Sequence, residues 1–255
     1  QFDITIIGKE PYPNYNRIML SNILQKKMTV EETIMNPYDW YKEHHIELIV
    51  NDPVEKVDRQ TKTVTTSKGI TVDYDICIFA TGSKAFVLPI PGSDLPSVIG
   101  WRTIEDTERM IDIAKTKKRA IVIGGGLLGL ECARGLMDQG MDVTVLHLAE
   151  WLMEMQLDHK AGDMLKADLE RQGMHIELQA NSKEIIGTDD VEAIELADGR
   201  VIETDLVVMA VGIRPFTEVA REAGLEVNRG IVVNDYLQTS DEHIYAVGEC
   251  AEHNG

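Results

Sequence analysis

The sequence is poor in cysteine, in aromatic residues and in basic charge. Three widely spaced cysteines among 255 residues cannot form a disulfide framework, hold an iron–sulfur cluster or build a structural zinc site. No apolar run reaches the roughly 20 residues that a membrane-spanning helix needs. Only 25 Lys and Arg stand against 43 Asp and Glu, and the net charge of −18 repels phosphate backbones and anionic lipids. We therefore expect neither nucleic acid nor a membrane among the partners, and no metal ligands.

The two ends of the sequence carry few signals of their own. There is no initial Met and no signal peptide, so a cytoplasmic setting is the default expectation. The chain opens in mid-pattern with an apolar strand at residues 2–7 and stops soon after Cys250. We expect both ends to be cuts within a longer protein.

Short, β-branched strands alternate with amphipathic helical segments along the chain. The continuous apolar runs at residues 120–123 and 206–209 suit parallel strands that are covered on both faces. Helical periodicity is predicted for three segments, residues 105–115, 127–139 and 158–172. This alternation of strand and helix predicts an α/β fold.

The sequence also repeats itself. Residues 3–7 resemble residues 142–146, and residues 75–82 resemble residues 205–212. A Gly-containing hairpin signal precedes both segments of the second match. Two matches in the same order disfavour the alternative that apolar strands look alike by chance. We predict two Rossmann-like dinucleotide-binding domains, each with a parallel sheet and a β-meander. The strand, glycine loop and helix that precede residues 142–146 have no counterpart before Asp3, so the first domain is expected to lack its first βα unit.

A glycine-rich loop marks the second copy. Gly124-x-Gly126-x-x-Gly129 follows the strand at residues 119–123 and opens the helix that begins at Leu127. In this arrangement the first glycine allows a tight turn, the second lets the backbone approach a pyrophosphate, and the third lets helix and strand pack closely. Seated inside a βαβ unit, the motif predicts a dinucleotide site rather than a plain tight turn.

The end of the next strand discriminates NAD from NADP. An acidic residue there accepts a hydrogen bond from the ribose 2′-OH, whereas an Arg would hold a 2′-phosphate. The chain offers His147, with Glu150 beyond it and no Lys or Arg before Lys160, which favours NADH. The alternative for His147 is an exposed residue at a strand end. In the first copy the equivalent position is Glu10.

At this point the residues resemble the two-domain flavoproteins of the pyridine nucleotide–disulfide oxidoreductase-like superfamily over nearly the whole chain. The resemblance is carried by several short motifs: Gly8-x-Glu10-Pro11, Tyr15-Asn16-Arg17-Ile18-x-Leu20-Ser21, Ala80-Thr81-Gly82-Ser83, the glycine loop, Val211-Gly212-Ile213-Arg214-Pro215 and Ala246-Val247-Gly248-Glu249. The last motif usually ends in Gly-Asp in that superfamily, and here Glu249 keeps the carboxylate.

A narrower resemblance is to the large subunits of assimilatory NAD(P)H nitrite reductases. It rests on residues 147–158, on Leu169-Glu170-x-x-Gly173 and on residues 248–255. Such a parent protein carries iron–sulfur and sirohaem modules outside these residues.

The resemblance implies two sets of nucleotide contacts. The expected FAD contacts are Glu10, Arg17, Ala80, Thr81, Gly82, Gly248 and Glu249. The expected NAD(P)H contacts are Gly124, Gly126, Leu127, Leu128, Gly129, Glu131, His147, Gly212 and Ile213. Glu131 is the one candidate for a catalytic part, beside the nicotinamide. Some relatives carry a Lys after the Leu-Ser pair to meet such a Glu, but this chain has Asn22, which leaves the role of Glu131 open.

These observations predict an FAD-binding domain at residues 1–103 plus 229–255 and an NAD(P)H-binding domain at residues 104–228. The expected function is hydride transfer from NAD(P)H to FAD, with electrons passing to iron–sulfur and sirohaem centres that reduce nitrite to ammonia. The fragment alone is not expected to reduce nitrite. The expected partners are nucleotides and downstream modules of the same polypeptide, with a small subunit and self-association left open. The alternatives are a stand-alone ferredoxin or rubredoxin reductase and a non-enzymatic redox sensor.

Without a phosphate loop in the first copy, the chain of residues 1–255 should bind FAD weakly or not at all. The purified chain can be mixed with FAD and the bound flavin measured by its absorbance after gel filtration. A yellow preparation with one flavin per chain would contradict this expectation.

Overall fold

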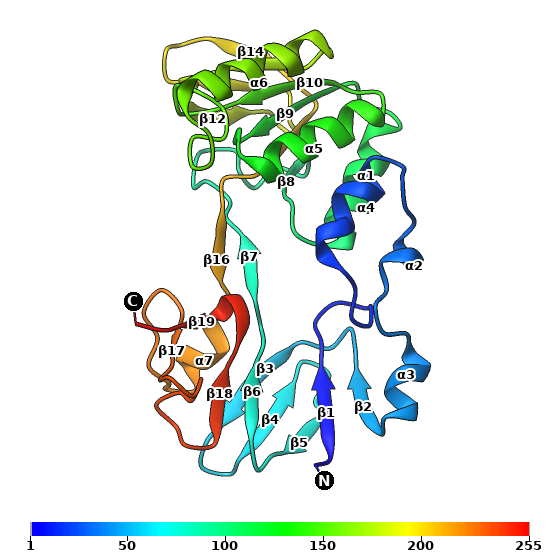
Figure 1. Cartoon of the computed structure of the whole chain (residues 1–255), viewed down its shortest axis with the longest axis vertical. Coiled ribbons are helices and arrows are strands. Elements are labelled where there is room, and N and C mark those ends of the chain that lie inside the picture. The colour runs from blue at the N-terminus through cyan, green and yellow to red at the C-terminus, as the bar shows by residue number, and fades with distance from the viewer. Residues whose placement is uncertain (1, 255) are drawn as a thin grey trace. The chain divides into compact units, whose positions relative to one another are not determined.

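The computed structural model describes residues 2–254 and has the predicted α/β fold (Figure 1). The backbone divides into two compact units. Unit 1 comprises Gln1–Asn16, Ile34–Lys84 and Ile213–Gly255, and unit 2 comprises Arg17–Thr33 and Ala85–Gly212. Among the described residues, no helix combines the length and the apolar character that crossing a bilayer requires.

Unit 2 contains a five-stranded parallel sheet with the order β11-β10-β9-β15-β8. Its strands are β8 (Val98–Gly100), β9 (Arg119–Ile123), β10 (Asp142–Leu146), β11 (His175–Glu177) and β15 (Leu206–Met209). The two central apolar runs are buried along their whole length, as parallel strands covered on both faces should be. The prediction of a parallel α/β sheet is confirmed.

Three longer helices of unit 2 match the predicted segments within one or two residues. They are α4 (Ile104–Ala114), α5 (Leu127–Asp138) and α6 (His159–Arg171). Figure 1 shows α5 beside β9 and β10, against which it packs. Thr103 begins α4 with a capping box, and the Asp158 carboxylate caps α6 by accepting from the Ala161 amide at 2.8 Å.

Each unit carries a three-stranded antiparallel meander, which confirms the two hairpin signals. In unit 1 the strands are β3 (Val54–Asp58), β4 (Thr63–Thr66) and β5 (Thr71–Asp73). In unit 2 they are β12 (Ser182–Ile186), β13 (Ala193–Leu196) and β14 (Val201–Glu203).

The parallel strands of unit 1 form separate pairs. Strand β1 (Ile4–Ile7) pairs with β2 (Ile46–Ile49), and β6 (Cys77–Phe79) pairs with β18 (Ile244–Ala246). By the repeat, β1 corresponds to β10 and β6 to β15, which in unit 2 lie on either side of β9. Within residues 2–254 no strand pairs with both β1 and β6 in the way that β9 pairs with both β10 and β15. Strands β1 and β6 accordingly leave the apolar side chains of Ile4, Ile6 and Ile78 exposed.

The remaining elements are short. In unit 1 they are α3 (Tyr38–Glu43), α7 (Glu218–Glu222), β17 (Ile231–Val232), η2 (Gly248–Cys250) and β19 (Ala251–Glu252). In unit 2 they are η1 (Arg17–Met19), α1 (Leu20–Leu24) and α2 (Val30–Thr33). Strand β7 (Ser83–Ala85) pairs with β16 (Ile213–Pro215).

The two units have different bounds from the two predicted domains. Residues 17–33 and 85–103 pack in unit 2, because α1 lies against α4 and α5 and because β8 pairs with β15. The contact of α1 is close, since a Cβ on Gly135 of α5 would lie 2.5 Å from Leu24 Cγ. Residues 213–228 pack in unit 1, where α7 lies against β3. Which nucleotide each unit binds stays a prediction.

Asp205 anchors the start of β15 to the start of β9. Its carboxylate accepts from the Arg119 amide at 2.9 Å and from the Lys118 amide at 3.2 Å, and it pairs with the Arg119 guanidinium. The hydrogen bond from the Arg119 side chain is the largest of the causes that lower the pKa of Asp205. Strand β9 leads into the glycine loop, and Ala210, just after β15, lies against Gly124. The Asp205 contacts therefore help to position the two strands that support the glycine loop.

We expect Asp205→Asn to lower the free energy of unfolding by about 1–3 kcal/mol near neutral pH, because hydrogen bonds to a charged acceptor are lost. The folded pKa lies below the usual 3.8, so the contribution is present above about 3.8 and is lost as the pH falls through the folded pKa. Urea unfolding of wild type and variant at several pH values should show that the difference between their free energies of unfolding becomes smaller in acid. Glu203→Gln is the control, because Glu203 also pairs with Arg119 but its side chain is 78 % exposed. A deficit that persists unchanged in acid would contradict the assignment.

Candidate functional site

The glycine loop at the carboxyl end of β9 is packed too tightly for side chains at two of its three positions. Gly124 has φ of +117°, and a Cβ built there would lie 2.4 Å from the Ala210 carbonyl oxygen. A Cβ on Gly129 would lie 1.9 Å from the Gly124 carbonyl oxygen. Around Gly126, by contrast, nothing lies within 4 Å of the Cβ position. The first and third glycines therefore serve the fold, and the second keeps open space at the start of α5.

The N-terminus of α5 receives no cap from a side chain. Its N-cap residue is Gly126, which has none to offer, whereas α4 and α6 are both capped. The first-turn amides and the helix dipole of α5 therefore face the open space beside Gly126, an arrangement that suits an anion. Leu127 and Leu128 flank this opening and are largely exposed.

His147 follows β10 directly and turns inward instead of outward. The residue is 6 % exposed, so its interpretation as an exposed strand-end residue is wrong. Its Nδ1 accepts a hydrogen bond from the Gly125 amide at 3.0 Å, and its Nε2 lies 2.9 Å from a carboxylate oxygen of Glu154. The ring supports the glycine loop because it packs against Gly125 and accepts a hydrogen bond from the Gly125 amide.

The other predicted NAD(P)H contacts are divided between the units. Glu131 lies half-buried on α5, one turn beyond the open N-terminus. Gly212 ends the run after β15, and its carbonyl oxygen accepts from the Phe86 amide at 2.9 Å in unit 2. Ile213 begins β16 and belongs to unit 1.

Most of the predicted FAD contacts lie in unit 1. The Tyr15 hydroxyl donates to the Glu10 carboxylate at 2.5 Å, just after β1. Thr81 follows β6 and donates its hydroxyl to the Phe216 carbonyl at 2.7 Å, with Ala80 and Gly82 on either side of it. Arg17 is the exception, because it lies in unit 2 and donates from Nη1 to the Arg102 carbonyl at 2.7 Å.

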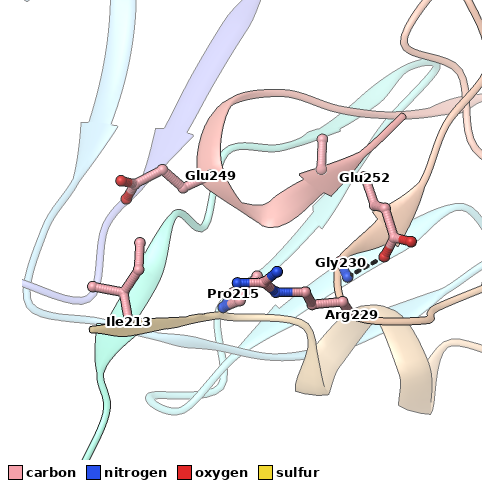
Figure 2. A pocket seen from close by; sticks show the side chains of 7 residues that line it. Ile213, Pro215, Arg229, Gly230, Glu249 and Glu252 are labelled. Carbon is pink, nitrogen blue, oxygen red and sulfur yellow. Dashed lines mark hydrogen bonds between the residues drawn. The ribbon is translucent and has the colours of Figure 1, made fainter. Parts of the chain in front are cut away.

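A cavity of about 240 Å³ in unit 1 brings two predicted residues together. It is lined by Ile213, Pro215, Arg229, Gly230, Glu249, Ala251 and Glu252. Figure 2 shows Glu249 and Ile213 at one end, and Glu252, whose carboxylate accepts from the Gly230 amide at 2.6 Å, at the other. The Glu249 carboxylate accepts from the Ser83 hydroxyl at 2.8 Å. Gly248 precedes it at the start of η2.

Sequence reasoning missed two charged residues of this cavity. Arg229 is exposed, and its guanidinium has no hydrogen-bond partner within residues 2–254. It lies in the turn before β17, which the pairing of β17 with β19 brings beside η2. Glu252 enters the cavity through the same pairing. No motif marks Arg229, and the resemblance over residues 248–255 gives Glu252 no role of its own, because the contact depends on the register of two strands that are distant in sequence.

The cysteines offer little to redox chemistry. Cys132 is buried on α5, and burial raises the pKa of its thiol. Burial raises the pKa of Cys77 to about 11. Cys250 is buried, and its thiol donates toward the Val247 carbonyl at 3.2 Å. Residues 2–254 contain no group of His, Cys, Asp and Glu side chains arranged to hold a metal ion.

Comparison with known proteins bears directly on this arrangement. Residues 1–255 match the protein family described as pyridine nucleotide-disulphide oxidoreductase. The chain belongs to this family. Membership implies binding of FAD and NAD(P)H, and the prediction of the superfamily from sequence motifs is confirmed.

Within the family the chain is similar to proteins of nitrogen assimilation and to solved reductases. It is 55% identical to the NAD(P)H nitrite reductase of Bacillus subtilis strain 168 over 100% of the chain and 32% of that protein. It is 46% identical to the assimilatory nitrate reductase electron transfer subunit of the same organism, over 100% of the chain and 33% of that protein. The chain thus spans about a third of the length of these curated relatives.

Among solved structures, the chain resembles the ferredoxin reductase for the CYP199A2 system of Rhodopseudomonas palustris. The TM-score is 0.91 at 31% identity, and the match covers 99% of this chain and 63% of that one. The chain therefore shares its fold with the matching part of that ferredoxin reductase.

The glycine loop yields a matched pair of variants. Gly126→Ala should cost less than about 1 kcal/mol of stability, because its Cβ meets open space, yet it should weaken dinucleotide binding about tenfold or more by occupying that space. Gly129→Ala should lower stability by about 1–3 kcal/mol, because its Cβ meets backbone. Thermal unfolding and calorimetric titration with NADH separate the two effects. Equal losses of stability would show that Gly126 is not held open for a ligand.

Proposed function

We propose that the chain is the FAD-dependent NAD(P)H reductase portion of a nitrite reductase large subunit. In this proposal the glycine loop of unit 2 binds NAD(P)H and unit 1 binds FAD. The observation that carries the proposal is the open space at Gly126 before the uncapped start of α5, in a chain matched along its whole length by the family. The finer assignment to nitrite reduction is supported by the 55% identity to a nitrite reductase.

On the nicotinamide nucleotide, the chain supplies position and charge rather than acid–base chemistry. The amides at the start of α5 donate to the pyrophosphate, and the dipole of the helix offsets its negative charge. Leu127 and Leu128 are exposed beside this opening and would shield a bound nucleotide from water. Glu131, one turn along α5, is the nearest ionisable side chain on the helix and orients the nicotinamide end. No protein proton is needed for hydride transfer, so the reaction depends on how precisely the two rings are held.

On the flavin, carboxylates of unit 1 hold hydroxyl groups. Glu249 accepts from the ribityl chain while Ser83 fixes its orientation, and Glu10, held by Tyr15, accepts from the adenosine ribose. Ala80, Thr81 and Gly82 would lie close to the pyrophosphate, and Arg17, which belongs to unit 2, stays a flavin contact that the sequence resemblance predicts. Bound FAD would supply an acceptor for the hydride of the nicotinamide and would allow the two electrons to be passed on one at a time.

The onward path of the electrons leaves this chain. In the proposal they pass to iron–sulfur and sirohaem modules of the same polypeptide, where nitrite is reduced to ammonia. Transfer of electrons from the flavin through a cysteine thiol does not apply here. The segment after Glu10 carries no cysteine, and the described cysteines are buried or partly buried. A small subunit and a second copy of the chain are further candidate partners.

A second candidate is a reductase that serves a separate ferredoxin or rubredoxin. The TM-score of 0.91 to a ferredoxin reductase favours it. The net charge of −18 disfavours it, because an acidic carrier would be repelled at long range.

The test uses the intact protein that contains this chain. Adding NADH without oxygen should bleach the flavin absorbance, and adding nitrite should then restore it. Restoration by a ferredoxin but not by nitrite would establish the second candidate, and restoration by nitrate alone would point to the acceptor of the nitrate reductase relative. Failure of NADH to bleach the flavin would overturn the proposal.

Glu249→Ala should lower flavin affinity about tenfold or more, since a charged acceptor is lost. The measurement is the flavin retained per molecule of the intact protein after dialysis. Glu252→Gln is the control in the same cavity, because an amide oxygen can still accept from the Gly230 amide. Equal flavin loss in both variants would contradict the role of Glu249.

A further inference from the structure

The position that normally accepts a hydrogen bond from the ribose of the nucleotide is occupied by His147, whose ring nitrogens already have partners within the protein. His147 follows β10 about 20 residues after the glycine loop, where an acid usually accepts from the ribose 2′-OH. Its Nδ1 accepts from the Gly125 amide at 3.0 Å, so the ring proton of the neutral side chain is on Nε2. That nitrogen lies 3.0 Å from the Trp151 carbonyl oxygen and 2.9 Å from the Glu154 carboxylate. Both ring nitrogens are therefore used within the protein.

The ring is also pressed against the loop, which fixes it in place. A Cβ added to Gly125 would lie 2.7 Å from His147 Cγ, so the ring fills the space beneath the loop. With one nitrogen accepting from the backbone and the other donating, the imidazole has no lone pair left for a ribose hydroxyl. The acceptor for the ribose has to come from another residue.

Glu154 is brought to this place by the segment that follows β10. The Met153 amide donates to the Gly125 carbonyl at 3.1 Å, so Gly125 is bonded to this segment through both its N–H and its C=O. Glu154 is the next residue. Its side chain is 35 % exposed, and His147 holds one of its carboxylate oxygens. The carboxylate is thus fixed at the edge of the glycine loop while part of it faces solvent.

The charges around this edge favour a ribose without a 2′-phosphate. No Lys or Arg occurs between Gly135 and His159, whereas Glu150, Glu154 and Asp158 all lie in this stretch. A fixed carboxylate accepts from two ribose hydroxyls but repels a phosphate dianion, and no neighbouring cation in the segment offsets that repulsion.

We propose that Glu154, held by His147, is the carboxylate that binds the adenosine ribose of the nicotinamide nucleotide and selects NADH over NADPH. This rests on the proposed function, in which the glycine loop binds that nucleotide. Glu150 is the competing acid, but it is exposed, and no partner among residues 2–254 fixes its carboxylate.

The experiment measures binding of ADP-ribose and of 2′-phospho-ADP-ribose to the intact protein by calorimetry. Wild type should bind ADP-ribose at least about tenfold more tightly. Glu154→Gln should weaken ADP-ribose binding about tenfold, as expected for loss of a charged acceptor, and should narrow the preference. Glu154→Arg should reverse the preference, a gain that a purely structural role would not give. Glu150→Gln is the matched control and should leave the ratio unchanged, and thermal unfolding should confirm that all variants are folded.

Two results would overturn the inference while leaving the proposed function intact. One is equal binding of both nucleotides by wild type. The other is a ratio of the affinities for ADP-ribose and 2′-phospho-ADP-ribose that stays unchanged in folded Glu154→Gln and Glu154→Arg. A ratio that responds to Glu150→Gln instead would assign the role to Glu150. Binding of neither nucleotide by wild type would overturn the proposed function itself.

Discussion

The contact between the Gly129 backbone and the Gly124 carbonyl is the constraint on which the rest of unit 2 depends. A Cβ added to Gly129 would lie 1.9 Å from the Gly124 carbonyl oxygen, so the first turn of α5 can lie against the end of β9 only if the third position has no side chain. This closeness aims the α5 amides at the space beside Gly126 and places β15, through Ala210, against the same turn. The capacity to bind a dinucleotide thus follows from packing, before any ligand is considered.

The pattern of local residues was sufficient to predict this part of the fold. Continuous apolar runs predicted β9 and β15, and the glycine spacing predicted where α5 begins. The hairpins at Lys68-Gly69 and Asp198-Gly199 followed from turn chemistry. These features could be read because each depends on residues that are close in sequence.

What could not be predicted depends on contacts between distant residues. The sequence pattern of residues 17–33 does not show which unit they join, and the packing of α1 against α4 and α5, with Leu24 against Gly135, assigns them to unit 2. The inward turn of His147 depends on its hydrogen bond with the Gly125 amide, which no sequence pattern displays. Arg229 reaches its cavity through the register of β17 and β19. In each case the deciding contact joins residues that are 20 or more positions apart in the sequence.

The separate strand pairs of unit 1 have a consequence for how these residues behave in isolation. Within residues 2–254, β1 pairs only with β2 and β6 only with β18, and both present isoleucines to solvent. A strand edge with free backbone groups and apolar side chains is a template for intermolecular pairing. The charge of −18 keeps copies apart at low ionic strength, and salt screens that repulsion within roughly 10 Å at 0.1 M. Colloidal stability of the isolated chain is therefore governed by electrostatic repulsion, which added salt weakens.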